Sequence, residues 1–455
     1  MALTPSQMSE PTRGDVIPST LARPGAAPFW FAVLLTGIGT GVASAALTRL
    51  LELVQRMVWG GSGADLLRAA ERAGAWRHIV VLLGAGIVTG AGQIVLRRLS
   101  SGNGIDTTAA IWFRAGRMPA WRTLGSAVLS VVIVGMGASL GREGAPKQAG
   151  AVIANFFSDW VRLSDEQRRL LVTCAAGAGM SAAYGVPLGG ALFALEVMRG
   201  VLALRYVLPA LIASVVAASV SWVALPDAPT YLIPAYSSST SSVVWALLAG
   251  PIAGVVSVGY IRAVTWADRN KPQGWRRLAA PVLGLGLLGV VSIWFQQVLG
   301  NGRDISQLAF TNQVAPGLLL ILFVLKPAAT VLCIRSGAPG GLFTPSLTVG
   351  ALLGALLGQA WSWFWPGVPP GLFAVLGAAA VLAATTQGPI STVVLMMELT
   401  GRDRSFIVPL LLAVATATLV ARTIEPRSIY DARLTDDEVE ARRKLRELAT
   451  PIAHG

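Results

Sequence analysis

The stretch Gly135–Lys147 carries the side chain with the clearest capacity for chemistry, Glu143. Glycines loosen the backbone on both sides of it, and Pro146 suits the first turn of a helix, where a missing N–H costs nothing. The backbone amides of Arg142 and Gly144 would then point beyond the helix end, which carries partial positive charge and favours anions. We therefore predict that these amides help to bind an anion.

The Glu143 carboxylate is itself an anion tethered at that place. It can occupy an anion site, and it can leave the site when it takes up a proton. This predicts a gate that exchanges places with a permeant anion and carries a proton. The alternative is a structural ion pair between Glu143 and a nearby Arg or Lys. Lys147, one turn further along, is a candidate supporting charge for an anion path.

Two other turns have a similar composition. Residues 340–345 (GGLFTP) combine a flexible glycine pair with a helix start, so the amides of Leu342 and Phe343 are candidate anion ligands. In residues 101–106 (SGNGID), the Asn103 side chain and Gly104 are further candidates, and Asp106 is a candidate helix cap or supporting charge. Each of these turns, taken alone, is also what an ordinary loop contains.

The composition indicates which elements position these turns. Of the 455 residues, 54% are hydrophobic and 13% are charged, whereas soluble domains average about 25% charged residues. Several apolar runs approach the roughly 20 residues that a helix needs to cross hydrocarbon: Phe29–Leu47, Ile79–Leu96, Val207–Leu225 and Val243–Ile261. The sequence therefore predicts an all-α polytopic membrane protein.

Other apolar segments are too short to cross a bilayer alone, so their ends must be buried in protein or line a cavity. They are Asn103–Trp112, Pro146–Phe157, Pro187–Met198 and Pro389–Leu399. A charged residue at the bilayer centre costs roughly 2.5–3.5 kcal/mol, so each needs a partner or a helix end at the interface. We expect such settings for four residues in particular: Glu196, Arg199, Lys326 and Glu398.

The chain divides into two halves of similar pattern, a first membrane repeat at about 29–226 and a second at about 240–424. Residues 141–146 (GREGAP) align with residues 340–345, and Pro187 precedes Glu196 by the same spacing as Pro389 precedes Glu398. Paired broken segments in matching halves point to a transporter-like binding site at the membrane midplane.

The remaining features exclude other classes of protein. The net charge of +13 comes from basic residues scattered over short loops, which is typical of charges that orient a membrane protein and not of nucleic-acid binding. Two cysteines and two histidines give no metal spacing and no catalytic cluster, so we expect no enzyme, metal or cofactor. Residues 1–28 are predicted to form a disordered tail without a cleavable signal, and residues 425–455 a short cytoplasmic tail containing one solvated helix.

The three turns resemble the signature loops of the CLC family of chloride channels and proton-coupled anion antiporters. Residues 174–199 and 336–345 resemble that family over longer stretches, and Tyr430 follows the last apolar run, where the family places a pore tyrosine. The resemblance implies about eighteen helical segments arranged as an inverted repeat, many of them broken. It also implies a homodimer in the inner (plasma) membrane, with one pore for anions and protons in each subunit.

By this resemblance, Glu143 is similar to the external gating glutamate. The Asn103 side chain, the amides near Leu342 and Phe343 and the Tyr430 hydroxyl are similar to the central anion site. No residue is implied in covalent catalysis, and a membrane-embedded enzyme has no support in the sequence.

Departures from the family pattern bear on the choice of anion. Asn103 and Asp106 replace the usual serine and proline, Pro146 is displaced by one position, and Val197 replaces the internal proton-transfer glutamate. These departures resemble the fluoride-exporting branch, and an amide offers two donors to strongly hydrated fluoride where a hydroxyl offers one. Phe343 keeps the chloride-type sequence. The sequence therefore predicts a fluoride/proton antiporter, with a chloride/proton antiporter or a passive chloride channel as the alternative.

Overall fold

The computed structural model describes residues 17–18, 26–60, 66–99, 107–402 and 404–449. Helices account for nearly all of the regular structure in these ranges. In the first part of the chain they are α1 (Ala26–Trp59), α2 (Leu66–Glu71), α3 (Ala75–Leu99), α4 (Thr107–Phe113), α5 (Ala120–Gly135), α6 (Gly144–Trp160), α7 (Asp165–Tyr184), α8 (Pro187–Phe193), the π-helical turn η2 (Ala194–Arg199) and α9 (Leu204–Ser221).

The second part of the described chain continues the pattern. Its helices are α10 (Thr240–Arg269), α11 (Arg276–Val291), η3 (Gln296–Val298), α12 (Arg303–Phe310), α13 (Pro316–Arg335), α14 (Phe343–Phe364), α15 (Pro370–Thr386), α16 (Pro389–Thr400), η4 (Arg404–Phe406), α17 (Ile407–Ile424), η5 (Ile429–Arg433) and α18 (Asp436–Ala449). The expectation of about eighteen helical segments is confirmed by the eighteen α-helices of the described residues.

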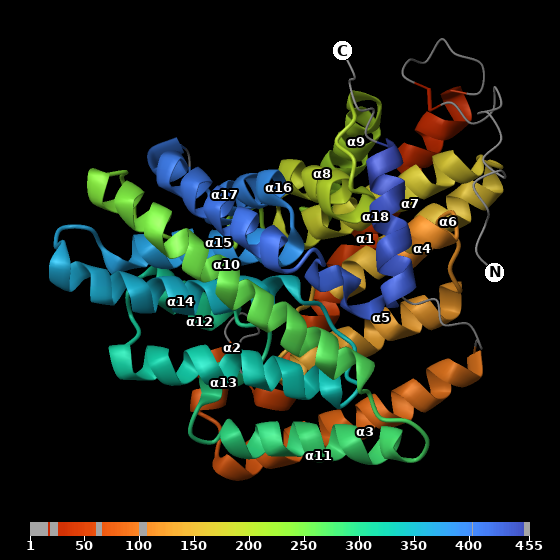
Figure 1. The fold of residues 1–455 in the computed structure, drawn as a ribbon. Coiled ribbons are helices and arrows are strands. Elements are labelled where there is room, and N and C mark those ends of the chain that lie inside the picture. Colours follow the sequence, from red (N-terminus) through yellow and green to blue (C-terminus); the bar gives the residue numbers. More distant parts are fainter. Residues whose placement is uncertain (1–16, 19–25, 61–65, 100–106, 403, 450–455) are drawn as a thin grey trace.

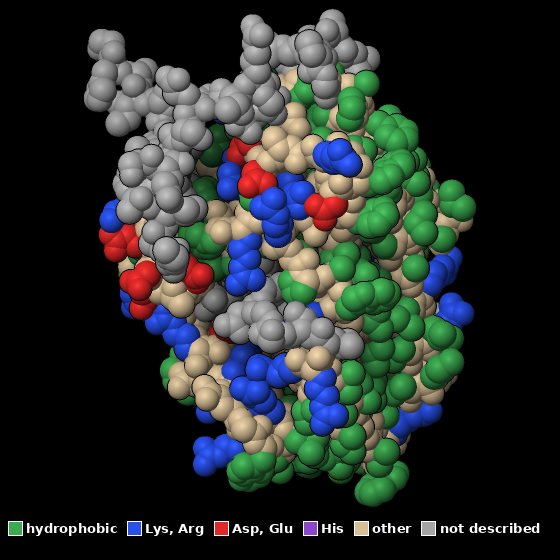
Figure 2. Space-filling view, turned by 90° about the vertical axis from the view of Figure 1, so that its right-hand side faces the viewer, with side chains coloured by type: hydrophobic (Ala, Val, Ile, Leu, Met, Phe, Trp, Pro, Cys, Tyr) green, Lys and Arg blue, Asp and Glu red, His purple; other side chains and the backbone are tan. Residues whose placement is uncertain are grey.

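Seven of these segments are long and apolar enough to cross a membrane, within the part of the chain that the structure describes: α1, α3, α9, α10, α13, α14 and the stretch that begins with α17. Most labelled helices lie near the horizontal or slope across the view, whereas α18 stands close to vertical (Figure 1). One side of the molecule presents a broad continuous hydrophobic surface (Figure 2). The predicted polytopic membrane protein is thus confirmed.

Glycines allow the same close helix packing in both halves. A methyl group at Gly41 of α1 would lie 2.6 Å from the carbonyl oxygen of Ala217 in α9. A methyl group at Gly254 of α10 would likewise lie 2.6 Å from the carbonyl oxygen of Ala417 in α17. Small residues let membrane helices approach closely. The repeated contact supports two related halves, and their boundaries at 29–226 and 240–424 remain a prediction.

The expected short segments are present with one difference. Helices α4, α8 with η2, and α16 are short, as predicted. The predicted segment Pro146–Phe157 lies within the longer helix α6, which includes the glycine and alanine before the proline. Pro146 falls in the first turn of α6, where its missing N–H removes no bond of the helix.

Two glutamates form reciprocal hydrogen bonds between the broken helices of the two halves. Glu196 at the end of the first pair accepts hydrogen bonds from the backbone N–H groups of Ile390 (3.1 Å) and Ser391 (2.6 Å) at the start of α16. Glu398 at the end of α16 accepts from Leu188 (3.0 Å) and Gly189 (2.6 Å) at the start of α8. The expected helix-end setting of Glu196 and Glu398 is confirmed.

The two cations expected in apolar runs also have partners. The Lys326 ammonium is fully buried and donates to the carbonyl oxygens of Val298 (2.8 Å), Leu299 (3.2 Å) and Gly300 (2.8 Å). Arg199 forms an ion pair of 2.5 Å with Glu166. Both therefore have the pairing that the cost of a charge in hydrocarbon requires.

The C-terminal helix differs from the prediction in one respect. Residues 436–449 form the expected short helix, α18. Most of its described charged side chains are exposed, but Arg442 is only 2% exposed. The helix is therefore not wholly solvated, because this arginine contacts the carboxylate of Asp431 and the carbonyl oxygen of Val197.

Candidate anion site

Two helix N-termini from the two halves meet at the centre of the described structure. Helix α6 begins at Gly144 and α14 at Phe343. The turns before them form an isolated antiparallel bridge, in which Gly141 and Gly341 each donate their N–H to the other's carbonyl oxygen at 2.8 Å. The predicted helix starts are confirmed, and the bridge brings the GREGAP and GGLFTP turns into contact.

The Glu143 carboxylate lies at the start of α14. One oxygen, Oε1, accepts a 2.6 Å hydrogen bond from the backbone N–H of Phe343. The other, Oε2, accepts from the hydroxyls of Tyr184 and Thr344, both at 3.3 Å. Glu143 is 0% exposed. These partners are amide and hydroxyl donors, rather than the Arg or Lys of the ion-pair interpretation, and such donors suit any small anion.

Two cavities are lined by residues next to Glu143 in the sequence. Gly144 and Gly340 line a cavity of about 260 Å³ whose wall is rich in cations. Arg142 lines a different cavity of about 210 Å³. Residues 142 and 144, which flank Glu143 in the sequence, thus line different cavities.

A small cavity of about 50 Å³ brings several predicted residues together. Its lining includes Gly144, Leu342, Tyr430 and Lys147. Candidates that are far apart in sequence thus share one wall, next to the start of both helices. Asn103, Gly104 and Asp106 lie outside the described residues.

Aromatic rings pack around Lys147 and Tyr430, two residues that line this small cavity. The Lys147 ammonium lies 4.5 Å from the centroid of the Tyr430 ring and 5.2 Å from that of Phe193. Phe193 packs edge-on against both Tyr430 (5.7 Å) and Phe343 (6.3 Å). A cation over ring faces is held electrostatically by their quadrupole. Lys147 therefore adds positive charge beside the candidate anion ligands.

Cations also gather in the wall of the 260 Å³ cavity. Arg97, Arg122, Lys271 and Arg277 line it together with the carboxylate of Asp268. Lys271 is paired with Asp268. A cleft lined mainly by one sign of charge concentrates ions of the opposite sign. The arrangement can therefore draw anions toward the start of α6 at Gly144 and toward Gly340 in the turn before α14.

Sequence reasoning missed two residues that bind the Glu143 carboxylate, Tyr184 and Thr344. Thr344 belongs to the GGLFTP turn, so its position beside Phe343 was an available signal. Tyr184 is the last residue of α7, and its ring also lies 4.8 Å from the Arg142 guanidinium. No spacing in the sequence relates Tyr184 to Glu143, because the contact depends on how α7 packs against α6.

Comparison with known proteins identifies the family to which this chain belongs. Residues 85–422 match the family described as voltage gated chloride channel. The chain belongs to the CLC family. The H(+)/Cl(-) exchange transporter ClcA of Vibrio parahaemolyticus is 31% identical over 315 residues, which cover 66% of this chain and 67% of that protein. ClcA of Citrobacter koseri is 29% identical over 444 residues, covering 93% and 91%.

Solved structures of CLC proteins share the fold. A slow cyanobacterial Cl−/H+ antiporter matches 94% of this chain and 100% of its own, with a TM-score of 0.78 and 22% identity. A CLC-type fluoride/proton antiporter matches 90% and 98%, with a TM-score of 0.72 and 22% identity. At this identity the comparison establishes the fold, which is the one that the resemblance implied.

Proposed function

We propose that this CLC protein is a proton-coupled anion antiporter and that chloride is its principal anion. The observation that carries the proposal is the buried Glu143 carboxylate at the start of α14, held by the Phe343 N–H at 2.6 Å. A tethered anion at an anion-binding helix start is a gate that a free anion can displace. The relatives of this chain that are named H(+)/Cl(-) exchange transporters support the same activity.

The mechanism follows from competition for the same donors. An anion that reaches Leu342 and Phe343 displaces the carboxylate from its N–H and hydroxyl partners. The released carboxylate can take up a proton. The neutral carboxyl then competes poorly for the positive end of the helix, so the anion keeps its place. When the proton leaves toward the other side, the carboxylate returns and the anion is expelled. One residue thereby links the two ion movements.

The choice of chloride over fluoride rests on the relatives and on one loop. The ClcA proteins named above exchange chloride according to their names, and Phe343 keeps the chloride-type sequence. Fluoride remains a second candidate because Asn103 and Val197 resemble the fluoride branch, and one structural neighbour is a fluoride/proton antiporter. The change Asn103→Ser should lower the ratio of fluoride to chloride flux, because a single hydroxyl compensates the dehydration of fluoride less well than an amide. An unchanged ratio would show that Asn103 does not line the anion site and would remove the main residue-level support for fluoride.

We further propose the inner membrane as the location, a homodimer with one pore per subunit, and a cytoplasmic position for the cation-lined cavity. Lys and Arg gather on the end of the molecule that faces the viewer in Figure 2, beside the hydrophobic surface. Cytoplasmic loops carry an excess of Lys and Arg, which supports this orientation.

Flux measurement tests the proposed function directly. Proteoliposomes loaded with chloride or with fluoride are given an outward anion gradient, and anion efflux and external pH are recorded together. Chloride efflux with proton uptake at a fixed ratio is the expected result. Efflux without proton movement, with a reversal potential indifferent to pH, would show a passive channel. Coupled fluoride efflux that far exceeds chloride efflux would replace chloride by fluoride.

A further inference from the structure

Arg442 of α18 is buried although it belongs to a helix rich in exposed charge. One of its nitrogens, Nη1, forms an ion pair with Oδ1 of Asp431. Nη2 donates a 2.9 Å hydrogen bond to the carbonyl oxygen of Val197, and the guanidinium lies 5.2 Å from the centroid of the Trp112 ring. Trp112 in turn donates to the carbonyl oxygen of Met198 at 2.9 Å. Arg442 thus joins α18 to the end of the broken helix η2.

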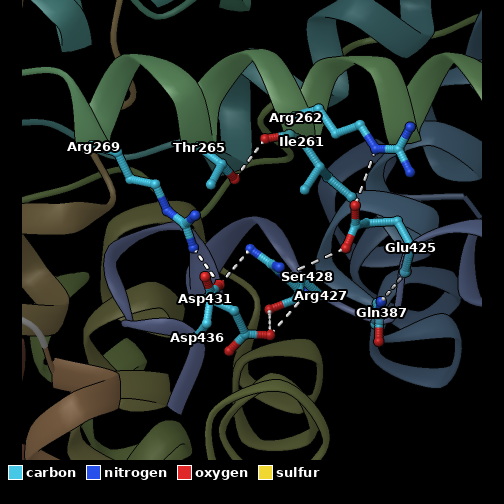
Figure 3. Close-up of polar contacts among 10 residues, drawn as sticks. All are labelled: Ile261, Arg262, Thr265, Arg269, Gln387, Glu425, Arg427, Ser428, Asp431 and Asp436. Carbon is cyan, nitrogen blue, oxygen red and sulfur yellow. Dashed lines mark hydrogen bonds and ion pairs between the residues drawn. The ribbon is translucent and has the colours of Figure 1, made fainter. Parts of the chain in front are cut away.

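Asp431, the partner of Arg442, directly follows Tyr430 in the short turn η5. Its second oxygen, Oδ2, accepts hydrogen bonds from the N–H (2.8 Å) and the hydroxyl (2.9 Å) of Ser428. Figure 3 shows Asp431 and Ser428 bonded to each other beside the exposed Asp436. The Asp431 carboxylate therefore links Arg442 to Ser428, and Tyr430 lies between Ser428 and Asp431 in the sequence.

Tyr430 lines the small cavity with Leu342, and its ring packs against Phe193 and lies under the Lys147 ammonium. The ring position depends on the backbone of η5, which Asp431 holds. A buried ion pair is a poor source of stability because both charges lose their water, so a role in fixing a unique geometry explains its presence better.

We propose that Arg442 is a positioning residue, which holds Tyr430 at the anion site through Asp431 and makes α18 a structural part of that site. The proposal rests on the proposed function in one respect, that Tyr430 takes part in binding the anion. Arg442 does not itself line the small cavity that Tyr430 lines. Its effect is transmitted along the covalent chain from Asp431 to Tyr430, at the place where Val197 stands instead of a glutamate.

A second group of ion pairs on the same helix provides a matched control for the loss of Arg442. Asp436, at the start of α18, pairs with Arg269 (2.5 Å) and Arg427 (3.0 Å). This contact is largely exposed and lies on the side of α18 that Figure 3 shows next to α10. Removing it should loosen the helix start without moving Tyr430, because Asp436 makes no bond to η5 among the described contacts.

The experiment measures chloride binding to the full-length, detergent-solubilised protein by calorimetry, which requires no proton coupling. Arg442→Gln should weaken chloride binding roughly tenfold, since small misplacements of a binding group are costly. Asp436→Asn should leave binding unchanged, and Arg442→Lys should restore part of it. In a Tyr430→Phe background, Arg442→Gln should add little further loss, because the two changes remove the same contribution.

Several outcomes would overturn the proposal. These are unchanged binding in Arg442→Gln, an equal loss from Arg442→Gln with and without the Tyr430→Phe change, an equal loss in Asp436→Asn, or normal binding in Tyr430→Phe. If Arg442→Gln does not yield folded protein, the double change Asp431→Asn with Arg442→Gln leaves no buried unpaired charge, and unchanged binding there would overturn it as well. Absence of coupled flux in the unmodified protein would refute the antiporter alone.

Discussion

The two pairs of broken helices use glutamate in different ways. Glu196 and Glu398 are reciprocal, because each accepts two backbone N–H bonds from the start of the helical segment that carries the other glutamate near its end. At the bridge between Gly141 and Gly341, among the described residues, the first half supplies a carboxylate, Glu143, and the second half supplies the backbone amide that binds it, that of Phe343.

This difference separates a structural contact from a candidate gate. In the reciprocal pair each helix start already binds a carboxylate from the opposite half through two of its N–H groups. At the central bridge the start of α14 has a single tethered anion, whose oxygens are shared with two hydroxyls. We propose that this loss of symmetry lets a permeant ion replace the carboxylate at the start of α14.

The largest effect should follow from Glu143→Gln. A neutral amide cannot carry the proton, so we expect proton coupling to be abolished, with anion flux either stopped or passive. Simultaneous recording of anion efflux and pH in proteoliposomes measures this. Proton-coupled flux that persists in the variant would remove Glu143 from the mechanism.

A methyl group at either bridging glycine should displace the carboxylate without changing its charge. A Cβ at Gly341 would lie 2.1 Å from Oε1 of Glu143, and one at Gly141 would lie 2.2 Å from Oε2. We expect Gly341→Ala and Gly141→Ala to lose most of the proton coupling to a similar degree, although they belong to opposite halves. The same flux assay measures both. Coupling that stays normal in both variants would show that the bridge does not control the gate.

The reciprocal glutamates should affect stability rather than coupling. Glu196→Gln and Glu398→Gln each weaken two charge-assisted bonds to backbone N–H groups, so we expect each to lower the free energy of unfolding by about 1–3 kcal/mol. Denaturation of the detergent-solubilised protein measures the loss, and the ratio of protons to anions in the flux assay should not change. A changed ratio in either variant would contradict the structural assignment.

The smallest effect should come from the cation-lined cavity. Arg97→Gln should raise the chloride concentration needed for half-maximal flux by roughly twofold at low ionic strength, and the difference should fade in high salt. Arg98→Gln is the matched control, since the lining of the cavity includes Arg97 and not Arg98. An equal effect of the two changes would show that the cavity does not concentrate the anion.

Much of the candidate site could be predicted because its parts are local. Glycines with a nearby proline mark a helix start, and this identified the turns at Glu143 and at Leu342–Phe343 without knowledge of the fold. The equal spacing of Pro187 from Glu196 and of Pro389 from Glu398 indicated paired segments. The role of Lys147 was open because a helix position does not determine which rings its long side chain will reach.

The sequence by itself determined the membrane class, the broken helices and the tethered anion, since hydropathy, proline position and a carboxylate beside glycines act over a few residues. Only the tertiary structure decided which groups Glu143 binds, because Phe343 and Tyr184 come from other helices. The same holds for Arg442, which reads as a solvated charge in sequence and is buried in the fold. The physical reason is that a hydrogen bond between distant segments depends on how the helices pack, and no local pattern encodes that packing.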